Sequence, residues 1–398
     1  ACGGPANNSG VTQLISFLSL LVCLCNVVEN HHVDQPLLLS PMDSSVIAQT
    51  SYEPWGAYVF ATARGVSLNP QDHGSWSHTD KKSVWLLGIK CEGSLNMNLA
   101  FSKFQLCNGS KIELLSSSMK PFGPVFTSSE NNEDFELWTH VVPGDEIWIR
   151  MHCLTAQKDQ ICKSIEVGQV NVGHQPFSMF HGSGGTPTTE DCHIDVRCEI
   201  SEGWEREIPS VAKYTIEGTS LCSGAMINNE LHDLDPLFIS AEHCGVDTIN
   251  DRSVVTYWNF ENSYCRPQGT EENASEGDGA EVLAIPGSEF LVSDLETDLL
   301  LLRLSEPPST CWGVTWSGWT RSASGAGGGS SIHHPRGAEK RISFPSNVTQ
   351  TTTPNPGAPE VDLKAWSVRW DNGTVEPGSS GSPLFNSQNR IIGTLCCG

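Results

Sequence analysis

The chain reads Glu376-Pro377-Gly378-Ser379-Ser380-Gly381-Ser382-Pro383 close to its C-terminus. A glycine- and serine-rich turn of this kind can present one hydroxyl beside free backbone amides, which is what a serine nucleophile needs. A glycine two residues before Ser380 lets the backbone turn so that the amides of Gly378 and Ser380 point into one oxyanion hole. Such turns are also common in ordinary loops, so the stretch is decisive only together with partners elsewhere in the chain.

The first partner is a histidine that follows a short apolar run. Residues 236–239 predict a buried strand, and the string Ile239-Ser240-Ala241-Glu242-His243-Cys244-Gly245 places His243 just after it. Cys222 precedes another strand-like run, and a disulfide from Cys222 to Cys244 would pin the loop that carries the histidine. A loop held in this way predicts a general base.

The second partner is Asp298, which leads directly into the apolar run 299–304. A carboxylate at that point can be held in low dielectric, where it would orient an imidazole and stabilise its cation. The order His243, Asp298, Ser380 has gaps of 55 (298 − 243) and 82 (380 − 298) residues. This is the chain order of chymotrypsin-type double barrels and differs from that of subtilisins and α/β-hydrolases.

From about Cys192 to its end, the chain resembles the lysyl endopeptidase group of trypsin-like serine proteases. The resemblance rests on several collinear strings, which together are much more specific than the turn alone. They are Cys192-His193-Ile194-Asp195-Val196-Arg197-Cys198, Cys222-Ser223-Gly224 with Ile227-Asn228-Asn229, Ala241–Gly245, Tyr257-Trp258-Asn259-Phe260, Ile332-His333-His334-Pro335, Glu339-Lys340-Arg341-Ile342-Ser343, and the turn Glu376–Pro383.

The resemblance implies a role for each candidate residue. His243 would be the general base, Asp298 its orienting carboxylate and Ser380 the nucleophile, with the backbone amides of Gly378 and Ser380 as the oxyanion hole. It also implies disulfides between Cys222 and Cys244 and between Cys198 and Cys265. Cys192 would pair with a residue beyond Gly398, so we expect the family's domain to be truncated at its C-terminus in this chain.

The fold expected from the resemblance is all-β. It consists of two six-stranded Greek-key barrels, the second incomplete, with the active site in the cleft between them. A metal site at His333-His334 is a competing interpretation, but adjacent residues on a strand point to opposite faces and do not easily ligate one ion. We therefore expect neither a metal nor another cofactor.

Ser379 departs from the commonest trypsin-like pattern, in which an aspartate before the nucleophile binds the newly cut N-terminal ammonium group. A hydroxyl cannot form that ion pair. We therefore expect an active-site geometry that does not depend on burying a new N-terminus. If a propeptide is removed, its removal would act by unblocking the cleft.

Composition and charge indicate a secreted protein. The chain has 15 cysteines in 398 residues, which points to an oxidising compartment, and Asn-x-Ser/Thr sequons at Asn108, Asn273, Asn347 and Asn372. Residues 1–29 contain an apolar run typical of a signal peptide, with a membrane anchor as the alternative. No later segment predicts a membrane span, and 46 acidic residues against 23 basic ones exclude nucleic acid as a favoured partner. We expect an extracellular monomer.

A second unit precedes the protease-like part. Runs at 83–89, 96–101 and 136–149 predict short strands at 30–176, arranged as an antiparallel sandwich that resembles the prodomain of the same protease group. Residues 177–191 predict a linker, and 192–398 the protease domain. Carbohydrate binding is the alternative role for the sandwich, but large aromatic residues are more often buried in a core.

The function predicted is that of a secreted serine endopeptidase that cleaves protein or peptide substrates through an acyl-enzyme, with basic-residue specificity suggested by the family. The alternative is a non-catalytic protease homologue that serves as an extracellular binding module. Relatives carry a histidine where this chain has Cys396. The pocket acid of relatives would lie beyond Gly398, so the sequence does not show which bond is cut.

Overall fold

The computed structural model of this chain describes residues 35–42, 56–177, 189–275, 277–280, 282–322 and 328–397. The expected leader at 1–29 and linker residues 178–188 lie outside the described residues. Among the residues described, no helix is long and apolar enough to cross a membrane. Strands dominate the structure, and the two α-helices that figure in it are short, α2 (Lys158–Ser164) and α3 (Glu271–Ala274).

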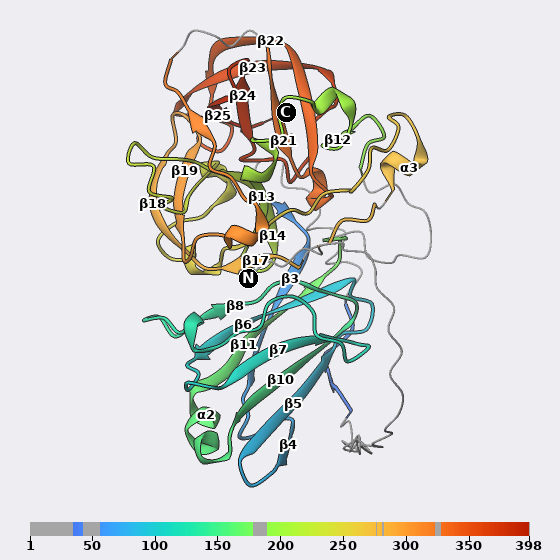
Figure 1. The fold of residues 1–398 in the computed structure, drawn as a ribbon, viewed down its shortest axis with the longest axis vertical. Helices are drawn as coiled ribbons and strands as arrows, with labels where there is room; N and C mark the ends of the chain where they lie inside the picture. Colours follow the sequence, from blue (N-terminus) through green and yellow to red (C-terminus); the bar gives the residue numbers. More distant parts are fainter. Residues whose placement is uncertain are drawn as a thin grey trace, which may run out of the picture. The chain divides into compact units, whose positions relative to one another are not determined.

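The N-terminal unit consists of two five-stranded sheets, coloured blue to green in Figure 1. One sheet contains β1 (Leu37–Leu38), β4 (Ser75–His78), β5 (Lys82–Lys90), β7 (Lys111–Ser116) and β10 (Glu146–Leu154). The other contains β3 (Ala61–Leu68), β6 (Asn96–Phe104), β8 (Leu137–Trp138), β9 (Val142–Pro143) and β11 (Ile165–Gly173). All the pairings are antiparallel except that of β1 with β5.

One hydrophobic core lies between these two sheets. Alternate residues of β5, β7 and β10 from one sheet, and of β6 and β11 from the other, contribute to the same cluster, because side chains of a strand alternate between its two faces. Trp85 is fully buried in this core and Trp148 is 3% exposed. The burial of these two tryptophans supports a core role over a sugar-binding one.

The protease-like part begins with a sheet that closes on itself. Its path is β17-β16-β13-β14-β15-β19-β18. The end strands β17 and β18 are separated only by Gly287, at φ +84°, so they form one bent strand that joins the two edges into a six-stranded barrel. The strands are β13 (Val211–Ile216), β14 (Ser220–Met226), β15 (Leu237–Ser240), β16 (Val255–Tyr257), β17 (Ala284–Pro286), β18 (Ser288–Asp294) and β19 (Leu299–Leu304).

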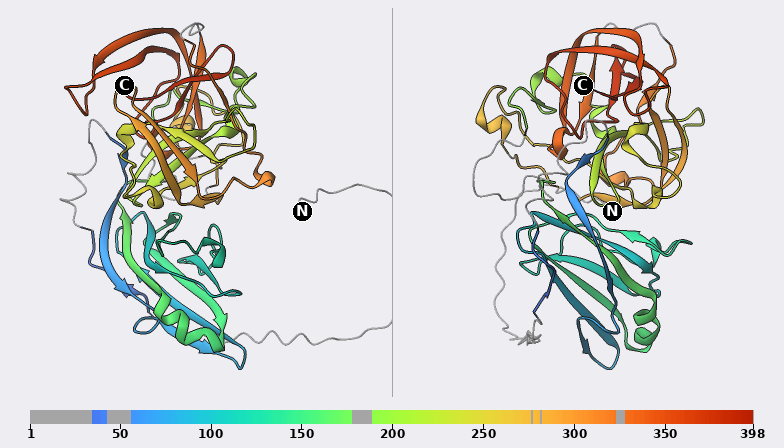
Figure 2. Two further views of the ribbon diagram at one scale, coloured as in Figure 1. Left: turned by 90° about the vertical axis from the view of Figure 1, so that its left-hand side faces the viewer. Right: turned by 180° about the vertical axis from the view of Figure 1, so that it is seen from behind.

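The second sheet follows the path β12-β22-β21-β24-β25-β20, with β23 paired to β22. No pairing between the end strands β12 and β20 closes it within the described residues. Figure 2 shows its orange and red strands curling round one another. The strands are β12 (Ile194–Asp195), β20 (Gly318–Trp319), β21 (Gly329–His333), β22 (Arg341–Pro354), β23 (Asp362–Asn372), β24 (Pro383–Asn386) and β25 (Arg390–Thr394).

A shared core holds the two sheets together. Val211, Ala225 and Ile239 of the first barrel belong to the same buried cluster as Ile332 and Ile342 of the second sheet. This contact brings the ends of β15 and β19 close to the turn before β24. The fold is therefore all-β and of the chymotrypsin-like double-barrel class, as the sequence predicts.

The described residues between 35 and 397 form one compact unit. The short strand before β3 pairs with the first barrel. β2 (Tyr58–Val59) lies antiparallel to Ser220 and Leu221 of β14. Phe177, the first residue of the expected linker, is only 1% exposed, and its ring lies 4.8 Å from that of Phe60 and 5.0 Å from that of Tyr257. Phe177 is therefore anchored between the two parts of the chain by its contacts with Phe60 and Tyr257.

Candidate active site

Two predicted site residues, His243 and Asp298, are in direct contact. Asp298 Oδ2 lies 2.7 Å from Nδ1 of His243, and Asp298 Oδ1 accepts a hydrogen bond of 2.8 Å from the backbone N–H of the same histidine. The side chain of His243 is 12% exposed and that of Asp298 is 4% exposed. The carboxylate therefore holds both the main chain and the ring of His243 in a site that excludes most water.

The local structure explains how Asp298 reaches this position. It stands immediately before β19 with φ +50°, a left-handed conformation that aspartate tolerates better than most residues. Its carbonyl accepts hydrogen bonds from the amide of Glu242 at 3.3 Å and from the hydroxyl of Thr394 in β25 at 3.3 Å. Both barrels therefore hold the backbone of Asp298.

The turn 376–383 carries the predicted nucleophile, Ser380, and is called the nucleophile turn below. It is built on two glycines with positive φ, Gly378 at +92° and Gly381 at +78°. A Cβ at Gly378 would lie 3.0 Å from the amide nitrogen of Arg336 and 3.1 Å from the carbonyl oxygen of His334. A Cβ at Gly381 would lie 2.0 Å from Oγ of Ser240. Only glycine fits both the dihedral angles and the space, which explains the spacing of the motif.

Ser223 ties this turn to the first barrel. Its amide donates to the carbonyl of Ser380 at 2.8 Å, and its hydroxyl donates to the carbonyl of Gly378 at 2.9 Å. The amide of His334 in turn donates to the Ser223 hydroxyl at 3.0 Å. This role of Ser223 was not predicted from the sequence. Its place directly after Cys222, in a family string, was the only available signal.

A buried hydrogen-bond chain continues from Ser223 toward the histidine. The Ser240 hydroxyl donates to the carbonyl of Ser223 at 2.8 Å, so the Tyr214 hydroxyl, 2.8 Å away, donates to Ser240. Burial raises the pKa of Tyr214, and the nearby Asp298 charge adds to the effect. Tyr214 therefore remains a neutral donor beneath the site.

Ser380 and His243 lie on adjoining segments, because Gly381 packs against Ser240 and Ala241, two to three residues before the histidine. In the part of the chain that the structure describes, no hydrogen bond joins the Ser380 hydroxyl to the His243 ring. Such bonds are often long without substrate and shorten in the reacting complex. The structure thus brings His243 and Asp298 into contact and places Ser380 on the neighbouring turn.

The two backbone amides predicted to form the oxyanion hole have no hydrogen-bond acceptor among the described residues. Ser379 donates its amide to Glu376 and Gly381 donates its amide to Leu395, each over 2.8–2.9 Å. The backbone amides of Gly378 and Ser380 donate a hydrogen bond to no group among the described residues. Two free donors in one tight turn form the arrangement that an oxyanion requires.

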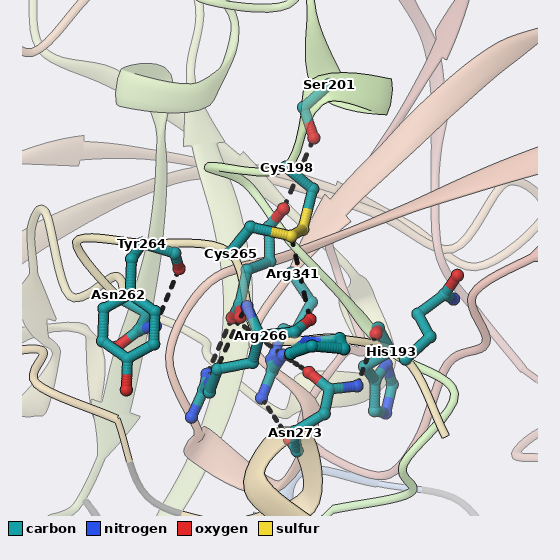
Figure 3. Close-up of a disulfide and its surroundings, with 12 residues drawn as sticks. His193, Cys198, Ser201, Asn262, Tyr264, Cys265, Arg266, Asn273 and Arg341 are labelled. Atoms are coloured by element: carbon teal, nitrogen blue, oxygen red, sulfur yellow. Dashed lines mark hydrogen bonds and ion pairs between the residues drawn. A yellow bond between two sulfur atoms is a disulfide. The ribbon is translucent and has the colours of Figure 1, made fainter. Parts of the chain in front are cut away.

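The structure contains both disulfides implied by the resemblance, Cys222–Cys244 and Cys198–Cys265. The first links β14 to the residue after His243. The second lies above a buried ionic cluster, shown in Figure 3, in which Asp195 accepts from Arg266 at 2.7 Å and lies 2.8 Å from Arg341. All three side chains of the cluster are fully buried.

Asn273, which stands in one of the sequons named above, belongs to the same buried region (Figure 3). Its side-chain amide donates to the carbonyls of Asp191 at 2.6 Å and His193 at 2.7 Å, and its oxygen accepts from Arg341 at 2.7 Å. The residue is fully buried. The sequon at Asn273 is therefore structural in this fold, because its side chain is buried and already hydrogen-bonded.

Glu376 connects this region to the nucleophile turn. One of its carboxylate oxygens lies 2.8 Å from Nε2 of His193 and accepts from the amide of Glu190 at 3.1 Å, and the other lies 2.8 Å from Nε of Arg336. Burial raises the pKa of Glu376, but these hydrogen bonds and charges outweigh it and lower the pKa below its usual value. The charged carboxylate thus anchors Glu190 and His193 beside the turn that carries Ser380.

Comparisons with known proteins show which family the chain is similar to. A family model described as the C-terminal domain of lysyl endopeptidase matches residues 186–398. The chain is 27% identical over 257 residues to lysyl endopeptidase of Pseudomonas aeruginosa, over 62% of this chain and 53% of that protein. The chain thus spans about half the length of this relative.

Among solved structures, the active form of the Rv3671c protease from M. tuberculosis is similar with a TM-score of 0.32 and 15% identity, over 47% of this chain and 69% of that one. An HtrA-type protease with a bound tripeptide has a TM-score of 0.34 and 14% identity, over 50% of this chain and 54% of that one. Because the family model covers more than half of the chain, this protein belongs to the lysyl endopeptidase family.

Proposed function

We propose that the chain is a serine endopeptidase that uses His243, Asp298 and Ser380 as its catalytic triad. Ser380 attacks the carbonyl of the scissile bond, while His243 accepts the proton of the serine hydroxyl and passes it to the leaving amine. The amides of Gly378 and Ser380 stabilise the oxyanion of each tetrahedral intermediate. Water, activated by the same histidine, then hydrolyses the acyl-enzyme.

The observation that carries the proposal is the double contact of Asp298 with His243. The contact to Nδ1 leaves the lone pair of Nε2 free to accept the serine proton, since the carboxylate can only accept the N–H of Nδ1. A histidine held by both its backbone amide and its ring cannot easily turn away. This arrangement does the work of a general base and has no evident use in a binding module.

The free amides of Gly378 and Ser380 favour catalysis over the alternative of a non-catalytic homologue. Backbone donors in folded proteins are almost always paired with protein groups or water, and two in the same turn that have no acceptor among the described residues are open to a ligand oxygen. A developing oxyanion is such a ligand.

Further features belong to the proposal. We propose that residues 30–176 act as a prodomain, joined through the linker 177–191 to a protease domain at 192–398. We further propose that the protein is secreted, acts on protein or peptide substrates as a monomer, and prefers a basic residue before the scissile bond, as the names of the family and its relative suggest. The disulfides of the structure suit an oxidising compartment.

The test is covalent labelling of the chain with a fluorophosphonate, followed by peptide mapping. We expect one adduct, on Ser380, and its loss in Ser380→Ala and His243→Ala. The matched control is Ser387→Ala, an exposed serine that lies close in sequence and has no contact with the triad. A folded chain that stays unlabelled would favour the non-catalytic homologue. The proposed specificity is then tested with three peptide substrates that differ only in the residue before the scissile bond, which is lysine, arginine or leucine.

A further inference from the structure

We propose that His333 is a positioning residue for the oxyanion hole, acting through a buried hydrogen-bond relay that ends on Ser379, the residue before the nucleophile. The relay runs from the carbonyl of Thr374 through Ser343 and His333 to Ser379. It rests on the proposed function, because it orients the turn that carries Ser380. None of its members needs to touch the substrate.

The relay joins two strands to the nucleophile turn. His333, the last residue of β21, lies with Nδ1 2.8 Å from the Ser379 hydroxyl and with Nε2 3.1 Å from the Ser343 hydroxyl. The Ser343 hydroxyl, in β22, donates to the carbonyl of Thr374 at 2.8 Å. The amide of Glu376 closes the arrangement by donating to the Ser379 hydroxyl at 3.3 Å.

The direction of every proton in the relay follows from one fixed end. The Thr374 carbonyl can only accept, so Ser343 uses its proton there and its oxygen must accept from Nε2–H of His333. The ring is then the Nε2–H tautomer, which leaves a lone pair on Nδ1. Ser379 donates its proton to that lone pair, and its oxygen remains free to accept from Glu376.

The surroundings keep the ring in this neutral form. His333, Ser343 and Ser379 are fully buried. Burial and then the neighbouring His193 and Arg341 hold the pKa of His333 well below its usual value. The ring of His193 lies 5.6 Å away, and its Nε2 contacts Glu376 rather than His333. A neutral imidazole keeps its acceptor, and a protonated one would lose it.

The relay matters because it ties together both ends of the segment 374–379. Ser343 holds the carbonyl of Thr374, and His333 holds the side chain of Ser379, one residue from each of the two free amides, those of Gly378 and Ser380. A turn fixed at both ends keeps these donors aimed at one point before any substrate arrives, and such preorganisation is what makes an oxyanion hole effective. Here a neutral relay performs the task that an aspartate and a buried ammonium group perform in the commonest trypsin-like pattern.

Two near-isosteric variants separate the two ends of the ring. In His333→Asn the amide oxygen can take the place of Nδ1 and accept from Ser379, while the bond to Ser343 is lost. In His333→Gln the amide nitrogen can take the place of Nε2 and donate to Ser343, while the acceptor for Ser379 is lost. Both variants lose one hydrogen bond at the same position. If His333 had a purely structural role, both would therefore change the rate of Ser380 phosphonylation by the same factor.

The measurement is the rate of Ser380 phosphonylation as a function of fluorophosphonate concentration, with folding checked by circular dichroism. For His333→Gln we expect the limiting rate constant to fall about 10- to 100-fold, as for a small misplacement of reacting groups, with the half-saturating concentration within about twofold. For His333→Asn we expect a rate within about threefold of the parent. In a Ser379→Ala background, His333→Gln should have no further effect, because the relay is already cut.

A rate for His333→Gln equal to that of the parent, or equal losses in the Asn and Gln variants, would overturn the relay. A second measurement does not depend on activity: ¹⁵N NMR of the His333 ring in the parent chain. An Nε2–H tautomer supports the relay, and an Nδ1–H tautomer overturns it. If the folded parent is not phosphonylated at all, the proposed function fails, and the NMR result still decides the relay.

Discussion

Replacing Asp298 by asparagine tests the central contact of the proposed triad with little change of shape. Asparagine tolerates the left-handed backbone of this position, φ +50°, about as well as aspartate does. Its oxygen can still accept the amide of His243, as Oδ1 of the aspartate does at 2.8 Å. The amide nitrogen then faces Nδ1 of the ring, 2.7 Å away, and can only donate.

The expected loss of reaction rate in Asp298→Asn follows from a change in the tautomer of His243. An amide N–H that points at Nδ1 forces the ring proton onto Nε2, so the histidine can no longer accept the proton of Ser380. In a serine protease triad the change from aspartate to asparagine lowers the rate by about 10⁴, or about 5.4 kcal/mol in the activation free energy. The loss of the charge-assisted hydrogen bond accounts for about 1.5–3 kcal/mol, and the wrong tautomer for the rest.

The assay is the phosphonylation rate of Ser380 at constant pH, with the unfolding free energy measured in urea on the same samples. The matched control is Asp294→Asn, an exposed carboxylate at the end of β18 that does not contact His243. We expect the control to react like the parent. A folded Asp298→Asn variant that reacts within threefold of the parent would show that Asp298 does not set the tautomer of His243.

Three further predictions concern the turn, the disulfide and a buried histidine. Gly378→Ala should slow phosphonylation at least tenfold and lower the unfolding free energy by about 1–3 kcal/mol, since φ is +92° and the new Cβ would meet backbone atoms at 3.0–3.1 Å; labelling and urea titration check both. Removing the Cys222–Cys244 disulfide, which spans 22 residues, with a double alanine variant should cost about 3 kcal/mol in urea unfolding, and an unchanged midpoint would contradict this. Burial lowers the pKa of His140 from 6.5 to about 4, although its hydrogen bond to the Phe122 carbonyl opposes the shift. The unfolded chain therefore binds this proton at higher pH than the folded one, so the contribution of His140 to stability falls by up to about 3 kcal/mol as pH drops from 6.5 to 4. Urea unfolding of the parent and His140→Gln across that range should show a smaller loss in the variant.

Much of the strand pattern could be predicted because it depends on local periodicity. The runs 83–89, 96–101 and 299–304 all lie in strands, β5, β6 and β19. Along β19, buried and partly buried residues alternate. Leu300, Leu302 and Leu304 belong to the core of the first barrel, whereas Leu299 and Leu301 pack against the core that the two barrels share. Periodicity shows that a strand exists more readily than it shows what covers each face.

The predicted triad residues could be found in the sequence, whereas the residues that position them could not. His243 and Ser380 stand in recognisable strings, and Asp298 opens an apolar run. The hydrogen bonds of Ser223 with Gly378 and of His333 with Ser379 instead join residues 155 and 46 positions apart in the sequence. The burial of the sequon at Asn273 could not be predicted for the same reason. Its burial depends on Asp191, His193 and Arg341, which no local pattern connects to it.

The sequence by itself determined which functional groups the candidate site contains: a hydroxyl in a glycine turn, an imidazole after one strand and a carboxylate before another strand. These are properties of residue type and short-range order, and they follow from backbone dihedral preference and strand periodicity. The tertiary structure alone decided which amides stay free, which oxygen orients the histidine and which neutral ring supports Ser379. Hydrogen bonds and burial depend on the distance between atoms in space, and the packing of the two barrels sets those distances.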